Sequence, residues 1–150
     1  MPEKKTVEKA KRDLRQGKSP TTAAGEFVRE EIHHVREGKH GARSTKQAIA
    51  IGLSKARRAG VPLKPPKRGS RRTKESAERA YETGQGQRKP RSPSRSRARA
   101  TRKALKREPH RTASHKAMSR QGKRSAAQRS RASRSAAARK GWRTRRRRGH

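Results

Sequence analysis

The sequence predicts an all-α protein, with a small N-terminal module of two or three short helices followed by a largely disordered basic tail. Apolar residues recur at helical spacing mainly within residues 1–60. Only 25% of the 150 residues are hydrophobic, 39% are charged, and the formal net charge is +36. Residues 1–60 hold 15 Lys and Arg against 7 Asp and Glu, so residues 61–150 carry the remaining +28. Such a composition indicates disorder over much of the length.

The first helix is expected within residues 2–18. Val7, Ala10 and Leu14 share one face at helical spacing, and Gly17 is suited to end the helix. The apolar stripe is thin, so this helix offers little apolar surface to a core.

The second helix has the clearest start signal in the chain. Ser19 is placed as its N-cap and Pro20 as its first residue, where a missing N–H costs nothing. Gly38 ends it, and Gly25 within it suggests a close helix crossing. Its apolar stripe consists of Ala24, Phe27, Val28, Ile32 and Val35.

The third helix begins at Ser44, which with Gln47 fits a capping box, and ends at Gly60. Its stripe consists of Ala48, Ile49, Gly52, Leu53 and Ala56. Ile51 lies off this stripe and is the aliphatic side chain available to a partner. We expect the second and third helices to form the folding nucleus through Phe27, Ile32, Ile49 and Leu53.

Beyond this module (residues 1–60), the sequence predicts three further segments. Residues 61–72 contain three prolines and form a basic linker. Residues 73–82 could form a short helix that is too short to be stable alone. Residues 83–150 form a low-complexity tail with 25 Lys and Arg against a single acid, Glu108, and should be mostly coil in isolation.

A chain with this charge needs a polyanion to become compact. Arg pairs bidentately with phosphate and stays charged, so a dense Arg and Lys tail is suited to a nucleic-acid backbone. Single-strand binders normally present several aromatic side chains for base stacking, whereas this chain has one Phe, one Tyr and one Trp. Duplex DNA is therefore the favoured partner, and RNA remains possible.

The candidate nucleic-acid-binding residues fall in two groups. One surrounds the third helix, where cations could orient the module on nucleic acid, and the other lies near the end of the tail around its lone tryptophan. The residues are Arg43, Lys46, Lys55, Arg57, Arg58, Arg139, Lys140, Trp142, Arg143, Arg145, Arg146, Arg147 and Arg148.

The second and third helices also allow a helix-turn-helix interpretation. The turn over residues 38–43 is longer than usual but contains Gly, and the start of the third helix could meet phosphates or base edges. The alternative is an αα-hairpin with solvated charges, which we favour.

Sites for catalysis or cofactors are not expected. In the segment EEIHHVREGKH, Glu30 and Glu31 stand three or four residues before His33 or His34, as in the Glu-x-x-His motif of di-iron proteins, but no second copy of that motif exists. We therefore predict no metal site and no cofactor. The chain has no cysteine and no phosphate-binding glycine loop, so we predict that it is not an enzyme.

The segment GKSPTTAAGEFVREEIHHVREGKHGARSTKQAIAIGLSKARRAGV, residues 17–61, closely resembles the defining segment of a family of small, highly basic bacterial proteins known only as a domain of unknown function. The segment ATRKALKREPHRTASHKAMSRQGKRSAA is similar to that family's C-terminal region. The resemblance implies a bacterial, cytoplasmic protein and brings no known binding residues. In composition the tail is also similar to bacterial histone H1-like proteins, which condense DNA.

These observations predict a nucleoid-associated protein that binds DNA through phosphate contacts without sequence preference. Two alternatives remain open: an RNA- or ribosome-associated basic protein, and a protein-partner module on the faces of the second and third helices. No apolar run approaches the length of a membrane span, and no signal peptide is evident, so we expect no membrane partner.

Overall fold

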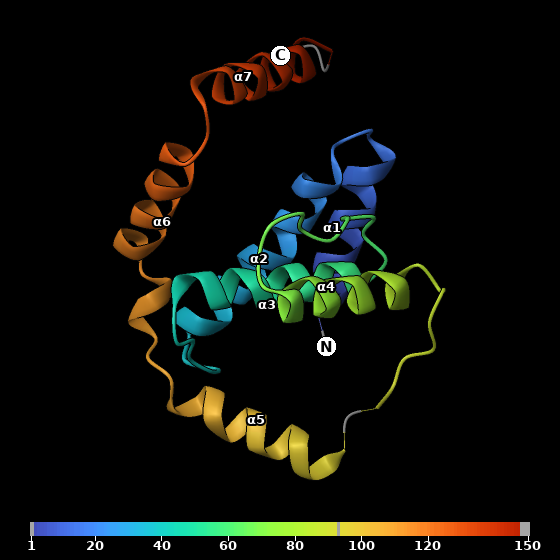
Figure 1. Ribbon diagram of the computed structural model, residues 1–150, viewed down its shortest axis with the longest axis vertical. Coiled ribbons are helices and arrows are strands. Elements are labelled where there is room, and N and C mark those ends of the chain that lie inside the picture. Colours follow the sequence, from blue (N-terminus) through green and yellow to red (C-terminus); the bar gives the residue numbers. More distant parts are fainter. Residues whose placement is uncertain (1, 93, 148–150) are drawn as a thin grey trace. The chain divides into compact units, whose positions relative to one another are not determined.

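A computed structural model describes residues 2–92 and 94–147 of the chain. Across these residues it contains seven α-helices, one short 3-10 helix and no strand, which confirms the all-α prediction (Figure 1). The chain divides into two compact units, Met1–Ser114 and His115–His150. The helices are α1 (Lys4–Arg15), α2 (Pro20–Arg36), α3 (Thr45–Arg58), α4 (Arg71–Gly84), α5 (Arg95–Arg107), η1 (Arg111–Ala113), α6 (His115–Ala127) and α7 (Arg131–Arg147).

The first three helices begin and end where the sequence predicts. The Ser19 side chain accepts a hydrogen bond from the Thr22 backbone N–H at the start of α2, and Ser44 accepts one from Gln47 at the start of α3. The capping box differs in one detail, because the Gln47 side-chain oxygen accepts from the backbone N–H of Arg43, at 2.7 Å, and not from that of Ser44.

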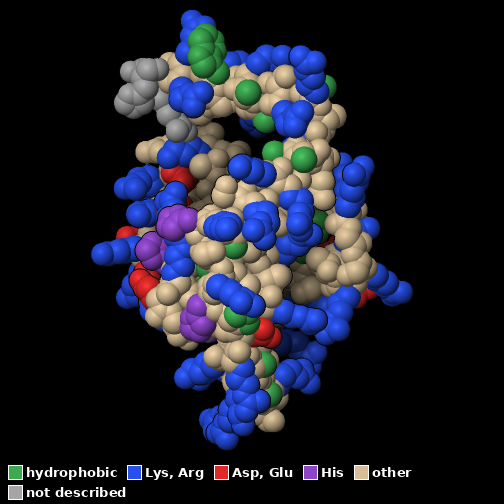
Figure 2. Space-filling model, turned by 90° about the vertical axis from the view of Figure 1, so that its left-hand side faces the viewer, with side chains coloured by type: hydrophobic (Ala, Val, Ile, Leu, Met, Phe, Trp, Pro, Cys, Tyr) green, Lys and Arg blue, Asp and Glu red, His purple; other side chains and the backbone are tan. Residues whose placement is uncertain are grey.

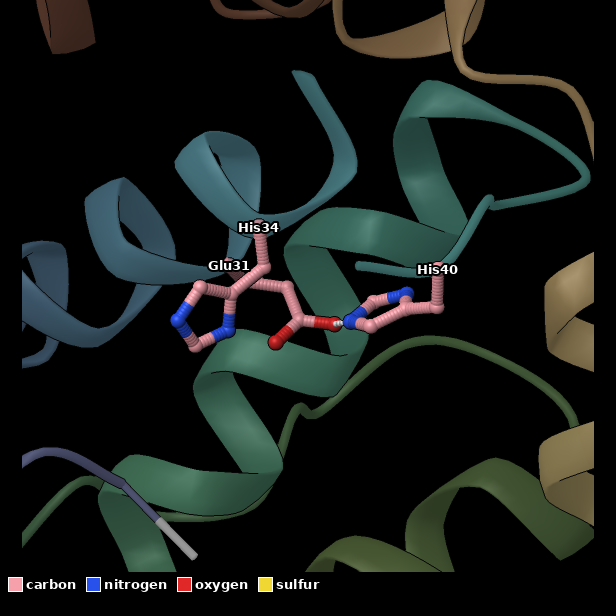
Figure 3. A group of neighbouring side chains, drawn as sticks. All are labelled: Glu31, His34 and His40. Carbon is pink, nitrogen blue, oxygen red and sulfur yellow. Dashed lines mark ion pairs between the residues drawn. The ribbon is translucent and has the colours of Figure 1, made fainter. Parts of the chain in front are cut away.

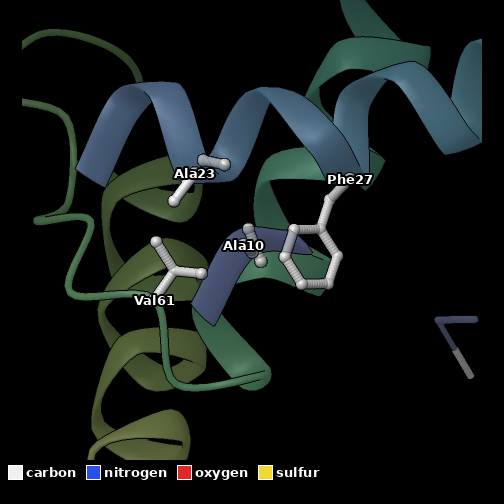
Figure 4. Packing of buried hydrophobic residues seen from close by; sticks show 6 residues of the cluster. Ala10, Ala23, Phe27 and Val61 are labelled. Carbon is white, nitrogen blue, oxygen red and sulfur yellow. The ribbon is translucent and has the colours of Figure 1, made fainter. Parts of the chain in front are cut away.

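Alanine fills most of the core of the N-terminal unit. The central cluster joins α1, α2, α3 and the residues that follow α3, with Phe27 as its one large side chain (Figure 4). Leu53 is only partly buried and Ile49 is half-buried. The two α3 residues of the predicted nucleus therefore lie at the edge of the core and not at its centre. The cluster consists of Ala10, Ala23, Ala24, Phe27, Ala56 and Val61.

Small side chains dominate the core because α2 and α3 cross at very short distance. A Cβ atom added to Gly52 of α3 would lie 2.7 Å from the Cα of Val28 in α2, well inside van der Waals contact. The sequence suggests Gly25 as the crossing point, but Gly25 is exposed and a Cβ there would meet nothing within 4 Å. Gly52 is therefore the glycine that the crossing requires.

Residues 105–113 pack on the turn between α2 and α3. The Gly41 N–H donates to the Leu105 carbonyl at 2.8 Å, and the Ala42 N–H donates to that of Pro109 at 3.2 Å. A Cβ at Gly41 would lie 1.7 Å from the Glu108 carbonyl oxygen, so only glycine allows this approach. This docking extends the compact unit to Ser114, far beyond residue 60.

The side chains of Thr45, Thr112 and Arg36 add three more bonds to the same contact, and His110 Nδ1 lies 3.1 Å from the Val35 carbonyl oxygen. The Thr45 hydroxyl donates to the Thr112 carbonyl at 2.6 Å, and the Thr112 hydroxyl donates to that of Ala42 at 2.9 Å. Arg36 donates from Nε to the Ala113 carbonyl at 2.6 Å. Ala113 itself is fully buried. The segment is thus held by paired backbone groups and a small apolar contact, which require no aliphatic stripe.

The prediction of a largely disordered tail over residues 83–150 is wrong, because α5, α6 and α7 occupy most of it. Ala, Arg, Lys and Gln all favour helix. Ser94 caps α5 by accepting from the Arg97 N–H, and the Ser130 side chain accepts from the Ser133 N–H at the start of α7. Helix propensity and N-caps therefore favour helices here, against the repulsion between like charges on which the prediction of disorder was based. No described residue of these three helices is buried.

Alanine substitutions at the two helical glycines should have opposite effects. Gly52→Ala forces α2 and α3 apart and should lower the free energy of unfolding by about 1–3 kcal/mol. Gly25→Ala adds a better helix former in open space and should raise it by about 0.5–1 kcal/mol. Urea unfolding followed by circular dichroism measures both. Equal effects of the two substitutions would contradict a close crossing at Gly52.

Truncation tests the docking of residues 105–113. A chain ending at residue 114 should unfold at the same urea concentration as the full chain, when the change is followed in the N-terminal unit. A chain ending at residue 92 loses the five hydrogen bonds described above and should be less stable by at least about 1 kcal/mol. Equal stability of the two truncated chains would show that the docked segment contributes nothing.

Candidate nucleic-acid interface

An open pocket of about 630 Å³ lies in the N-terminal unit, at the end of α3, along α4 and beside the residues that follow α4. Five of the side chains that line it are cationic, and none is acidic. We call it the cationic pocket. Its lining residues are Arg58, Ser76, Arg79, Ala80, Thr83, Arg88, Lys89, Pro90 and Arg91.

The cationic pocket exists because the ends of α3 and α4 touch through their backbones. A Cβ at Gly84 would lie 1.8 Å from the carbonyl oxygen of Arg57, so glycine is required there. The Gln85 side-chain amide donates to the Gly60 carbonyl at 3.3 Å and holds the same junction. Ala77 and Ala80 are the buried residues of α4, which is longer than the predicted 73–82 helix. This contact brings Arg58 of α3 close to the cations of α4.

Arg57, a candidate phosphate ligand by sequence, is buried under the linker. Its guanidinium donates to the carbonyl of Leu63 at 3.0 Å and to that of Lys64 at 3.3 Å. Burial lowers the pKa of Arg57 from its ordinary value, because the charged form loses solvation. Its role in this structure is to fix residues 63–64 against α3.

The cations of the pocket line one open concavity, and few of them are paired with acids. Arg88 is 3.3 Å from the Glu82 carboxylate, and this is the ion pair recorded for the side chains that line the pocket. Like charges held together repel, so an anion placed among them is stabilised by several partners at once. Four of the five are arginines, whose planar donors match the oxygens of a phosphate group.

The helix α7 carries the second group of candidate residues. Arg139, Lys140, Arg143, Arg145, Arg146 and Arg147 are all exposed, whereas Arg148 lies outside the described residues. Trp142 is 55% exposed, and the Arg146 guanidinium carbon lies 4.9 Å from its ring centre as a cation–π contact. Arg139, Arg143 and Arg147 follow at intervals of four, where like charges destabilise a helix unless an anion neutralises them.

The remaining candidate residues of the module are placed differently. Arg43 and Lys46 are exposed at the start of α3. Lys55 instead forms an ion pair with the buried Glu31 carboxylate, at 2.6 Å. Because residues 105–113 cover the turn before α3, and Thr45 bonds to Thr112, the end of α3 that a recognition helix would insert is partly occupied by the chain itself.

Charge is distributed over much of the visible surface. In Figure 2, Lys and Arg side chains are spread across the face shown, whereas acidic side chains are few and several lie near histidines. Glu31, His34 and His40 come together in this structure and could hold a metal ion. No helix within the described residues has both the length and the apolar character needed to cross a membrane.

Nothing in the sequence distinguishes Arg79, Arg88, Lys89 and Arg91 from the many other basic residues. Their selection depends on how α4 packs against α3, and the only local signal was Gly84 at the end of a helical pattern. His40 was likewise not paired with Glu31. Glu31 lies on α2 and His40 in the turn that follows, so helical spacing does not relate the two residues.

No family model, curated protein or solved structure matches this chain. The resemblance of residues 17–61 to a family of basic bacterial proteins stays a prediction.

The two neighbouring arginines at the end of α3 should respond differently to alanine. Arg57→Ala removes a buried guanidinium together with its two hydrogen bonds to carbonyl groups. It should lower the free energy of unfolding by at least about 2 kcal/mol. Arg58→Ala removes an exposed side chain and should change it by less than about 0.5 kcal/mol. Urea unfolding distinguishes them. A loss in Arg57→Ala as small as that in Arg58→Ala would mean that Arg57 lies at the surface.

Proposed function

We propose that this protein binds nucleic acid without sequence preference, through phosphate contacts, and that its partner is duplex DNA of the bacterial nucleoid. The cationic pocket supplies a fixed set of phosphate ligands. The exposed cations of α5 to α7 bind further phosphates of the nucleic-acid backbone. The function is one of binding and not of catalysis.

The observation that carries this proposal is the composition of the cationic pocket. Arg58, Arg79, Arg88, Lys89 and Arg91 line one pocket and come from α3, α4 and the following segment, with no acid among the lining residues. A solvated surface of a basic protein would show cations interspersed with acids and pointing apart. Five cations lining one concave site favour an anion with several oxygens, such as a run of phosphates.

The distribution of aromatic side chains favours duplex over single-stranded nucleic acid. Phe27 is fully buried in the core, and Tyr81 is half-buried on α4. Trp142 is thus the exposed aromatic of the described residues. One exposed ring does not make a stacking platform for successive bases, so affinity must come from the backbone.

A protein-partner role for the faces of α2 and α3 finds less free surface than the sequence suggests. α1 packs on α2, α4 packs on α3, and residues 105–113 cover the turn between them. RNA or ribosome association keeps the same phosphate chemistry and is an outcome of the experiments below.

The salt dependence of binding tests the proposal directly. The full chain is titrated against two duplexes of unrelated sequence, and against a structured RNA, at several salt concentrations. Counterion release predicts a steep linear fall of log K with log salt, equal for the two duplexes, with a slope of about −0.9 for each phosphate neutralised. Binding that does not change with salt would contradict phosphate contacts, and tighter binding of the RNA would favour the RNA alternative.

Matched variants locate the contacts. Replacing Arg58, Arg79 and Arg91 with Gln should reduce the magnitude of the salt slope by up to about 0.9 for each lost contact. The control replaces three exposed arginines outside the pocket, Arg12, Arg15 and Arg68, and removes the same total charge. Equal changes in both triple variants would mean that net charge alone, and not the pocket, determines binding.

A further inference from the structure

Three potential metal ligands lie outside the cationic pocket, where α2 ends and the chain turns toward α3. Glu31 and His34 come from α2, and His40 comes from the turn (Figure 3). A carboxylate oxygen and one nitrogen from each ring all lie within 4.8 Å of one another. We propose that Glu31, His34 and His40 bind a divalent transition-metal ion of the Zn²⁺ type.

The Glu31 carboxylate is the first reason. It is fully buried, and its Oε2 atom accepts from the Lys55 ammonium at 2.6 Å. Its Oε1 atom has no hydrogen-bond partner among the described residues, although His40 Nε2 is only 3.2 Å away. A buried carboxylate oxygen without a partner is strongly unfavourable, so Oε1 calls for a cation.

The orientation of His40 is the second reason. Its Nδ1 atom lies 3.0 Å from the Gly41 carbonyl oxygen, which can only accept, so Nδ1 carries the hydrogen. In the neutral ring, Nε2 then presents a lone pair toward Glu31 Oε1. Two lone pairs at 3.2 Å repel unless a positive ion bridges them, whereas a protonated ring would form the ion pair drawn in Figure 3.

The distances suit a metal better than a proton. A bridging proton must lie near the line between the two atoms, but the contact between His40 Nε2 and Glu31 Oε1 is not a hydrogen bond. A zinc ion about 2.0–2.2 Å from each atom would instead lie off that line, and tetrahedral ligands at these lengths are separated by about 3.3 Å. The observed 3.2 Å already matches this separation.

His34 completes the set and has a partner behind it. Its Nε2 atom is 3.3 Å from the Glu3 carboxylate, which leaves Nδ1 for the metal. In Figure 3 the His34 ring lies beside the Glu31 carboxylate, on the other side from His40. A carboxylate that accepts from the outer nitrogen of a metal-bound histidine fixes its ring and strengthens its basicity.

Both acidic and basic side chains surround the three proposed ligands. His34 shares a surface pocket with four of the eleven acidic residues, and Glu31 adds a fifth. Several cations oppose the added charge and limit the affinity. They are Lys55 on the Glu31 carboxylate, and the Lys and Arg side chains that line the pockets of His34 and His40: Lys9, Arg29, Lys39, Arg97, Arg102 and Lys106. Two imidazoles favour Zn²⁺ and its neighbours over Mg²⁺ and Ca²⁺, which prefer oxygen ligands.

A bound ion would have a structural effect. It would join α2 to the turn that precedes α3, the same turn on which residues 105–113 dock through Gly41. His34 and His40 are 13% and 20% exposed, so an ion has access from solvent. Three protein ligands leave a fourth position for water.

The test uses the full chain without a histidine tag, in a buffer without phosphate. Zn²⁺ is titrated by calorimetry, and thermal unfolding is recorded with Zn²⁺ or Mg²⁺. One Zn²⁺ should bind per chain and raise the unfolding temperature, whereas Mg²⁺ should not. His34→Gln and His40→Gln should each weaken Zn²⁺ binding at least about tenfold, a loss that removal of a partner behind a ligand already produces.

His33→Gln is the matched control, because His33 is the exposed neighbour of His34 on the same helix. It should change the affinity less than about threefold. If His40→Gln fails to fold, X-ray absorption of the zinc-loaded wild-type chain decides, and it should show two imidazole ligands. No binding of micromolar Zn²⁺, an equal loss in His33→Gln, or fewer than two imidazoles would overturn the proposal.

Discussion

The close crossing of α2 and α3 at Gly52 is the contact on which the rest of the structure depends. Because no side chain separates the helices there, alanines and Phe27 are enough to fill the space between them. A chain with few large aliphatic residues can therefore still form a buried core. The crossing also brings Lys55 to the buried carboxylate of Glu31 and sets the turn on which residues 105–113 dock. α4 then packs on α3, so that Arg79 of α4 and Arg58 of α3 line the same pocket.

Much of the helical module could be predicted because its signals are local. The N-caps Ser19 and Ser44, and the glycines that follow the helices, specify where α2 and α3 begin and end. The docking of residues 105–113 could not be predicted, since it depends on backbone groups and on the absence of a side chain at Gly41, neither of which produces a periodic pattern. The crossing glycine was missed for the same reason, because spacing does not separate Gly25 from Gly52.

The candidate site was predictable in its chemistry but not in its residues. The charge of +36 favours a polyanionic partner such as nucleic acid, which stays a prediction. Which cations converge depends on packing: Arg57 turns inward to carbonyl groups, Lys55 pairs with Glu31, and only Arg58 of that group lines the cationic pocket. The proposed metal ligands follow the same rule. Glu31 and His34 share a helix, but His40 reaches them only through the fold of the turn.

Crosslinking in bacterial cells, with identification of both the attached nucleic acid and the crosslinked residues, tests the central claim most directly. Phosphate binding by the cationic pocket and α7 predicts DNA of many unrelated sequences, attached mainly within residues 79–91 and 139–147. Recovery of RNA alone, or of no nucleic acid, would contradict a DNA-binding role. Crosslinks as frequent on the exposed lysines of α1 as in those two segments would contradict the interface.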